Sequence, residues 1–411
     1  MRLADTAGLR RSYISFNAAL GSLYENDLLE LADATDKPDF VDSAFFDAAG
    51  MVYNAGGFDP SQLNTPEARR LIAETLKQLD KAISSGLPHE VPEVVRYALE
   101  NNAFIFSGFK AFHTLREVGL SLTTDKGDIK PFETFRRDVE KVNNQYNHNY
   151  LYAEYNHAVG ASLMAARWQQ IEADGDRYDL QYRTAQDDRV REDHAILHGT
   201  TLPPSDPFWS QYLPPNGWNC RCTAVQVRKG KYPQSDPALS MLRGQNCTEA
   251  ARQQIFRFNP GKELKLFPPK HPYYKAPEAA RQEVFHIARR EAQKNAEAIN
   301  FDCESLQTGK LFQTRKAKQR AYGHAFNLEE LEMYDYIIAN ASKLVFEHFS
   351  PLGEVKDLTN PKDIKNIQNK RKRGVTGYNV YYFNYNGIIW QVKTEVFKNR
   401  EEAVYHIMKK K

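Results

Sequence analysis

The chain has 411 residues, of which 41% are hydrophobic and 26% are charged, and its net charge is +3. One hydrophobic core seldom exceeds about 300 residues, so we expect two or three domains. No apolar run of about 18 residues could span a membrane, and the first residues lack the apolar stretch of a signal peptide. Four cysteines are too few for a disulfide scaffold of this size, which indicates a reducing compartment.

The charge is unevenly distributed along the chain. Residues 311–411 contain 18 Lys and Arg against 11 Asp and Glu, a net charge of +7, whereas residues 1–310 carry −4. A basic module on a mildly acidic body favours contact with nucleic acid. A solvated surface with extra lysines explains the same numbers equally well.

In chain order, the pattern predicts an α+β protein with a mainly helical N-terminal half. Thr65, Pro66 and Glu67 are typical of a helix start, and the aromatic segment 103–109 is expected in the core. We expect one or two long helices over 131–172, with a kink or loop at 143–149, and then short strands and a helix around 190–198. The predicted domains are a helical region 1–130, a small α+β domain 131–256, a linker and helix 257–310, and a basic α+β domain 311–411.

Within the linker, the Pro-rich stretch 257–275 is expected to be extended and 276–298 to be helical. In the last domain we expect a helix over 328–349, a basic loop over 351–374 and a β-hairpin. Asn386-Gly387 between two alternating apolar runs is a strong signal for that hairpin turn. Alternation places Trp390, Val392, Thr394 and Val396 on a buried face, and Lys393 with Glu395 on the open face.

The densest cluster of polar and sulfur-bearing residues lies between 182 and 222. His194 and His198 are four residues apart, so with Cys220 and Cys222 they could ligate zinc, although one residue between the cysteines is an unusual spacing. A structural polar network is the alternative we favour, in which Trp209 and Trp218 cover a set of charged groups: Arg183, Asp187, Asp188, Arg191 and His194. A catalytic Cys/His pair is a third alternative. No cofactor is expected unless zinc binds.

This segment resembles the phage Mu protein F-like family of minor head proteins, over about residues 40–230. The residues that carry the resemblance are Tyr182, Arg183, Thr184, Asp188, Val190, Arg191, His194, Leu197, Gly199, Pro207, Phe208, Trp209, Pro214, Pro215, Gly217, Trp218, Cys220, Arg221 and Cys222. His198 stands where the family commonly has an acidic residue. The resemblance implies a virion head component, present in the host cytoplasm during assembly, whose partners are the portal, other head proteins and nucleic acid.

The C-terminal module resembles, in element order, size and charge, the barnase–EndoU–colicin–RelE-like nucleases of phages. Metal-free RNA cleavage needs a proton acceptor, a proton donor and cations around the phosphate. Candidates for catalysis are His324, Lys393, Tyr405 and His406, and candidates for nucleic-acid binding are Lys365, Arg371, Lys372 and Arg373. Tyrosines such as Tyr378 could stack on bases. The alternative is a purely structural head protein whose basic domain holds packaged DNA without catalysis.

Overall fold

The computed structural model describes residues 3–24, 38–124, 127–250, 252–354 and 359–410, and of residues 3–12 and Ile14 it describes the backbone alone. The chain divides into two compact units, residues 1–284 (unit 1) and 285–411 (unit 2). Within the described parts, no helix is both long enough and apolar enough to cross a membrane.

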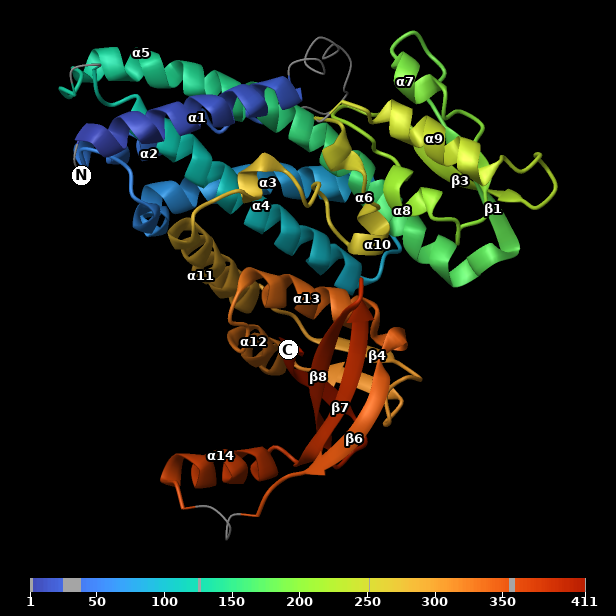
Figure 1. Cartoon of the computed structure of the whole chain (residues 1–411). Coiled ribbons are helices and arrows are strands. Elements are labelled where there is room, and N and C mark those ends of the chain that lie inside the picture. Colours follow the sequence, from blue (N-terminus) through green and yellow to red (C-terminus); the bar gives the residue numbers. More distant parts are fainter. Residues whose placement is uncertain (1–2, 25–37, 125–126, 251, 355–358, 411) are drawn as a thin grey trace. The chain divides into compact units, whose positions relative to one another are not determined.

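Unit 1 is dominated by a helical bundle (Figure 1). Its helices are α1 Leu3–Tyr24, α2 Asp42–Asn54, α3 Pro66–Gly86, α4 Glu93–Leu120, α5 Phe132–Asn143, α6 Leu151–Asp174 and α10 Pro260–Glu263. The predicted start of α3 is confirmed, because the Thr65 hydroxyl accepts a hydrogen bond from the backbone N–H of Ala68 at 3.3 Å. The segment expected to be a kink or loop is not a loop: Asn144–Tyr150 is a π-helical stretch that joins α5 to α6.

Helix α4 forms the centre of this bundle. Its segment 103–109 is buried, as predicted. At the next residue, the Lys110 ammonium pairs with the Glu154 carboxylate of α6, and both side chains are almost completely buried. Tyr24 donates a further hydrogen bond of 2.9 Å to Glu154. A buried pair of this kind is satisfied only while both partners are present.

The prediction of an extended linker at 257–275 is wrong. This segment packs into unit 1, where the Phe267 ring stacks on Phe106 with centroids 3.7 Å apart. The Leu266 N–H donates to Asn102 at 2.9 Å, and His157 donates to the Leu266 carbonyl at 3.0 Å. Proline and lysine suggested exposure, but the aromatic residues between them determine where the segment lies.

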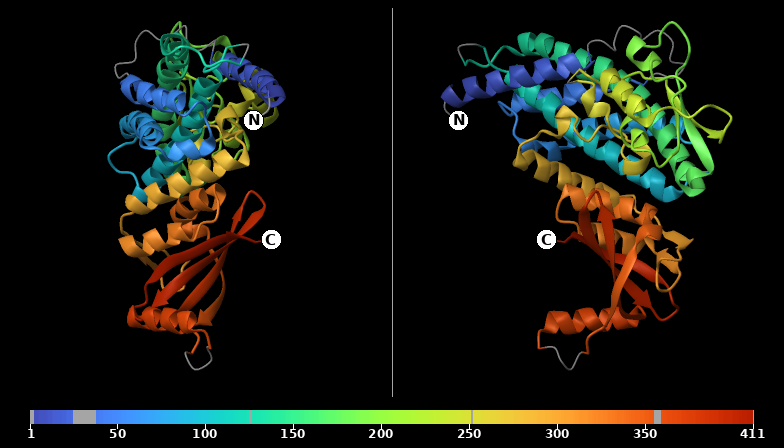
Figure 2. Two further views of the ribbon diagram at one scale, coloured as in Figure 1. Left: turned by 90° about the vertical axis from the view of Figure 1, so that its left-hand side faces the viewer. Right: turned by 45° about the vertical axis from the view of Figure 1, so that its right-hand side comes forward.

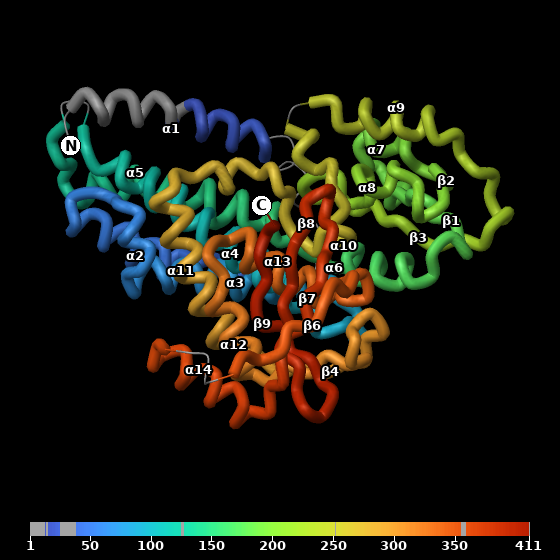
Figure 3. Tube along the Cα trace, turned by 60° about the horizontal axis from the view of Figure 1, so that its bottom comes forward, coloured from blue at the N-terminus to red at the C-terminus, as the bar shows by residue number. Residues whose placement is uncertain are grey.

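A small three-stranded sheet completes unit 1, in the order β2-β1-β3 and antiparallel throughout. Figure 3 shows α7, α8 and α9 gathered around it. The elements are β1 Tyr178–Arg183, α7 Glu192–Ala195, β2 Thr201–Leu202, α8 Phe208–Tyr212, β3 Thr223–Arg228 and α9 Pro237–Cys247. The predicted strands are confirmed, whereas the helix expected around 190–198 is limited to the single turn of α7.

Unit 2 is built on a six-stranded sheet in the order β4-β5-β9-β8-β7-β6. Neighbouring strands are antiparallel except β5 and β9, which are parallel. The elements are β4 Ile299–Asp302, β5 Lys310–Gln313, α12 Arg315–Gly323, α13 Leu328–Ala339, β6 Val345–Pro351, α14 Pro361–Lys372, β7 Val375–Tyr385, β8 Ile388–Phe397 and β9 Glu402–Lys409. Helix α11, Glu278–Lys294, was predicted and runs across the boundary between the units.

Two predictions in unit 2 are wrong in their element type. The helix expected to reach Phe349 ends at Ala339, and β6 takes the alternating aromatic residues that follow. The expected basic loop contains α14, whose first turn is capped by the Asn360 side chain. The hairpin between β7 and β8 is confirmed, since Asn386 and Gly387 both have the positive φ angles (+51° and +80°) of a tight turn.

Two views of unit 2 show the curvature of its long strands and the position of α14 beyond one end of them (Figure 2). Trp390, Val392 and Thr394 are buried on one face, as alternation predicts, whereas Val396, expected on the same face, is only half-buried. Glu395 was expected on an open surface, but only 2% of its side chain is exposed because Arg373 and Arg320 cover it. Together the two units confirm an α+β fold with a helical N-terminal half.

Candidate functional sites

The motif segment of unit 1 places its two tryptophans in the core rather than over a polar network. Trp209 is buried, with its indole N–H 3.4 Å from the Leu202 carbonyl. Trp218 is also buried and stacks on Tyr24 with ring centroids 4.8 Å apart. Tyr182 of β1 is buried as well and donates a hydrogen bond of 2.9 Å to Asn216. The aromatic part of the motif is therefore structural.

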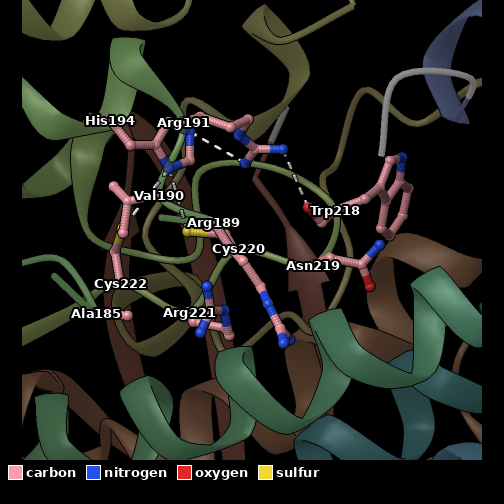
Figure 4. A pocket seen from close by; sticks show the side chains of 10 residues that line it. All are labelled: Ala185, Arg189, Val190, Arg191, His194, Trp218, Asn219, Cys220, Arg221 and Cys222. Atoms are coloured by element: carbon pink, nitrogen blue, oxygen red, sulfur yellow. Dashed lines mark hydrogen bonds between the residues drawn. The ribbon is translucent and has the colours of Figure 1, made fainter. Parts of the chain in front are cut away.

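Beside this core, His194 of α7 faces two sulfur atoms (Figure 4). Its Nδ1 lies 3.5 Å from Cys220 Sγ and 3.6 Å from Cys222 Sγ. Its other ring nitrogen, Nε2, accepts from the Arg191 guanidinium at 3.1 Å, and Arg191 also donates to the Trp218 carbonyl at 3.2 Å. The contacts join the turn of α7 to the loop that leads into β3.

A third cysteine approaches from α9. The ligand atoms of Asp193, His194 and Cys247 all lie within 4.8 Å of one another. Cys247 lies 25 residues beyond Cys222, outside any spacing that suggested a shared site, so sequence reasoning missed it. We name His194, Cys220, Cys222 and Cys247 the Cys/His cluster.

The thiols of this cluster differ in acidity. The hydrogen bond from Cys222 is the main cause that lowers the pKa of Cys220 well below its usual value, and the same contact raises the pKa of Cys222. Burial raises the pKa of Cys247 to about 12. The contact between the two sulfurs therefore makes Cys220 the more acidic of the pair.

The other polar residues of the motif do not join it. Arg183 bonds to Gln181 at 3.2 Å, and Asp188 is exposed. Asp187 pairs with Arg221, and His198 bonds to Thr184 at 3.0 Å rather than approaching the sulfurs. The predicted five-residue network is therefore reduced to Arg191 and His194, and the prediction of His198 as a metal ligand is wrong.

The second candidate site lies on one face of the unit 2 sheet, and we name it the sheet-face cluster. Its anchor is Glu395 of β8, whose two carboxylate oxygens each accept a hydrogen bond of 2.8 Å from Arg373. Arg320 of α12 lies 3.6 Å from the same carboxylate. Lys370 donates to the Tyr378 hydroxyl and lies 4.6 Å from the centre of the Tyr405 ring. Two arginines thus contact one carboxylate, and with Lys370 beside the two tyrosines the positive charges are in excess.

A bulge in β9 brings two more candidate groups to this face. The register passes from Lys393 opposite His406 to Thr394 opposite Val404, so Tyr405 is the extra residue. The His324 ring consequently lies 4.7 Å from that of Tyr405 and 5.6 Å from that of His406. His406 Nε2 is buried and has no hydrogen-bond partner among the described residues.

The electrostatics of the sheet-face cluster favour neutral imidazoles. Burial, followed by the charges of Lys370 and Arg320, lowers the pKa of His324. Burial and the neighbouring His324 and Lys393 lower the pKa of His406. Burial also raises the pKa of Tyr405, so its hydroxyl stays protonated. Proton acceptors and a proton donor therefore meet in one place.

The structure brings together three of the residues predicted to be catalytic, His324, Tyr405 and His406. The fourth, Lys393, lies opposite His406 in the pairing of β8 with β9. Arg373 is held by Glu395, whereas Lys365, Arg371 and Lys372 are exposed on α14. Sequence reasoning missed Glu395, Arg320 and Lys370. Strand alternation had placed Glu395 on the correct face, but nothing in the sequence indicated that two arginines would bury it.

Comparison with known proteins bears on unit 1. Residues 130–225 match the family model described as Phage Mu protein F like protein. The match covers about a quarter of the chain, so it is a similarity of this segment to the family. Protein F of Escherichia phage Mu, named for a role in capsid assembly, is 41% identical over 69 residues, and the Mu-like prophage FluMu F protein of Haemophilus influenzae is 38% identical over 85 residues.

These two alignments cover 16% and 19% of this chain. The chain spans only 16% and 20% of the length of these two relatives. No solved structure matches the chain significantly. The matched residues include α5, α6, β1, β2, the first residues of β3 and the loop with Cys220 and Cys222. Cys247 and the sheet-face cluster lie outside the matched region.

Proposed function

We propose that the protein is a phage or prophage head component that acts in capsid assembly through unit 1. The observation that carries this proposal is the match of residues 130–225 to the Mu F-like family, together with a relative named for capsid assembly. The partners would be the portal and other head proteins, and the location would be the virion head, reached through the host cytoplasm. The buried aromatic core of the motif supports a rigid docking element rather than an enzyme.

Co-expression of the full chain with the portal and major capsid proteins of the same phage tests this role. We expect the chain to sediment with head-sized particles and to be absent from them when the portal is omitted. Recovery of the chain as free protein in both cases would contradict the proposal. His324→Ala is the matched control, since a change in unit 2 should leave incorporation unchanged.

For unit 2 we propose metal-independent cleavage of RNA at the sheet-face cluster. The observation that favours it is the convergence of two neutral imidazoles, a protonated tyrosine and surplus cations on one sheet face. Because both oxygens of Glu395 already accept from Arg373, Glu395 is better suited to hold the arginines than to take a proton.

In the proposed reaction, His324 takes the proton of the ribose 2′-hydroxyl, and the 2′-oxygen attacks the phosphorus. The bond to the 5′-oxygen breaks, and Tyr405 supplies the proton that the leaving oxygen needs. Lys370, Arg320 and Arg373 stabilise the charge that develops on the phosphate oxygens. The products are a 2′,3′-cyclic phosphate and a 5′-hydroxyl, so DNA, which lacks the 2′-hydroxyl, is not a substrate.

Incubation of the full chain with RNA in the presence of a chelator tests this reaction. We expect His324→Ala to slow cleavage by about 100-fold or more and Tyr405→Phe, which keeps the ring, to slow it as well. His348→Ala is the matched control, because His348 is exposed on β6 and pairs with Glu347. Intact RNA at every protein concentration, with equal binding of RNA and DNA, would favour non-catalytic DNA retention instead. Cleavage that His324→Ala leaves unchanged would refute the assigned site.

A further inference from the structure

We propose that the Cys/His cluster of unit 1 binds one Zn²⁺, with His194 Nδ1 and the sulfurs of Cys220, Cys222 and Cys247 as ligands. This inference is independent of the proposed reaction in unit 2. It concerns the motif segment, in which the aromatic residues serve to pack the core but the cysteines have no role assigned so far.

The distances in the cluster fit a tetrahedral ion. With zinc about 2.0–2.1 Å from nitrogen and about 2.3 Å from sulfur, tetrahedral angles separate a ligand nitrogen from a ligand sulfur by about 3.5 Å. His194 Nδ1 lies 3.5 Å from Cys220 Sγ and 3.6 Å from Cys222 Sγ. A single position can therefore be about a zinc–ligand distance from all three atoms without moving the backbone.

The fourth ligand comes from a different element. Structural zinc sites are closed by four protein ligands, and the sulfur of Cys247 of α9 lies within 4.8 Å of a ring nitrogen of His194. Ligation by Cys247 requires its sulfur to approach Nδ1 to about 3.5 Å. Asp193 is the competing ligand, since one of its carboxylate oxygens, Oδ1, is buried without a hydrogen-bond partner among the described residues.

The charge around the cluster also suits a metal. Three thiolates and one Zn²⁺ carry a net charge of −1, and the Arg191 guanidinium lies 3.1 Å from the His194 ring to offset it. Arginine can only donate, so in the metal-free protein Nε2 accepts and the imidazole proton is on Nδ1, facing the sulfurs. Zinc would take the place of that proton on Nδ1, the same proton would move to Nε2, and Arg191 would move off Nε2 while keeping its bond to Trp218.

The ion would join three separate elements of a small fold. His194 belongs to the single turn of α7, Cys220 and Cys222 lie in the loop just before β3, and Cys247 ends α9. The sheet that these elements surround has three strands, one of them only two residues long. Metal binding that links such elements contributes directly to folding free energy.

Elemental analysis of the purified full chain, expressed with zinc, tests the proposal. We expect one zinc per chain in the wild type and in Cys303→Ser, the matched control, whose cysteine is in unit 2 beside Ser305. Cys220→Ser and Cys222→Ser should lose the stoichiometric zinc. Replacement of zinc by Co²⁺ in the wild type should give the intense thiolate-to-metal charge-transfer bands of a tetrahedral sulfur-rich site. This measurement does not require any variant to fold.

Cobalt spectra of two more variants identify the fourth ligand. Cys247→Ser should reduce the charge-transfer intensity by about a third while Asp193→Asn leaves it unchanged, because the intensity follows the number of thiolates. The opposite pattern would overturn Cys247 as a ligand in favour of Asp193. Wild-type protein without stoichiometric zinc and without a cobalt–thiolate spectrum would overturn the metal site, as would a Cys220–Cys222 disulfide found by mass spectrometry in protein purified under reducing conditions.

Discussion

The Cys/His cluster in unit 1 is enclosed by core residues, whereas the sheet-face cluster of unit 2 keeps part of its charge exposed. His194, Cys222 and Cys247 are buried, while the Arg320 and Arg373 side chains are 39% and 33% exposed. The first cluster can therefore be completed by one small ion, and the second has cations left over for a larger anionic ligand. The difference matches our proposals, which give the first cluster a structural role and the second a chemical role.

The largest effect should come from breaking the deepest ion pair of unit 1. Lys110→Met leaves the buried Glu154 carboxylate without its cation, and we expect a loss of about 3–5 kcal/mol in the free energy of unfolding. Hydrogen exchange should show the loss across unit 1 and not in unit 2. Arg70→Met is the control, because Arg70 and Asp47 are about half exposed and such pairs contribute about 0–1 kcal/mol. Equal effects of the two changes would contradict the view of unit 1 as a tightly paired core.

The next largest effect should be a difference between the two units in how their stability depends on acid pH. Burial lowers the pKa of His157 to about 4 and of His113 to about 3, so unfolding lets both bind protons. Their contribution to the free energy of unfolding is complete above the pKa of about 6.5 that they have in the unfolded chain. It is lost as the pH falls towards their pKa values in the folded protein, by about 3 kcal/mol for His157 at pH 4. His157→Gln should flatten this pH dependence. The half-buried histidines of unit 2 should give a smaller slope, and a steeper one there would contradict the comparison.

A smaller effect is expected from the anchor of the sheet-face cluster. Glu395→Gln removes the negative charge between Arg373 and Arg320, and because those arginines are partly exposed we expect a loss of about 2 kcal/mol in unit 2. RNA cleavage should fall too, since the arginines lose their fixed positions. Urea unfolding followed at Trp390 measures the first effect. An unchanged midpoint would show that the arginines are held by other contacts.

The smallest effect concerns the exposed lysines of α14. Lys372→Ala should reduce the slope of log affinity for single-stranded RNA against log salt by about 0.7, the value for one phosphate contact. Filter binding over a range of salt concentrations measures it. An unchanged slope would show that Lys372 does not contact an RNA phosphate, so that the RNA backbone binds elsewhere.

Much of the fold could be predicted from the sequence where a local signal was sufficient. The cap at Thr65, the hairpin at Asn386-Gly387 and the strands of the motif segment needed only neighbouring residues. The predictions for the linker and the basic loop were wrong, because their many prolines and basic residues were interpreted as a sign of exposed, irregular chain. Specific contacts determine the structure of those segments: Phe267 stacks on Phe106 in the first, and the Asn360 side chain caps α14 in the second.

The candidate sites show the same limit. His194, Cys220 and Cys222 could be singled out from the sequence, and so could His324, Tyr405 and His406. Cys247 and Glu395 could not, because each reaches its site through packing between distant elements. The bulge that brings Tyr405 and His406 to one face is a property of strand register, which no residue pattern in β9 indicated.

The assignment of structure to one cluster and chemistry to the other can be tested with two variants measured side by side. Zinc content and RNA cleavage should be determined on the full-length Cys222→Ser and His324→Ala proteins. We expect Cys222→Ser to lose its zinc and keep cleavage, and His324→Ala to keep its zinc and lose cleavage. Loss of both properties in either variant, or of neither in both, would contradict the separation of the two roles.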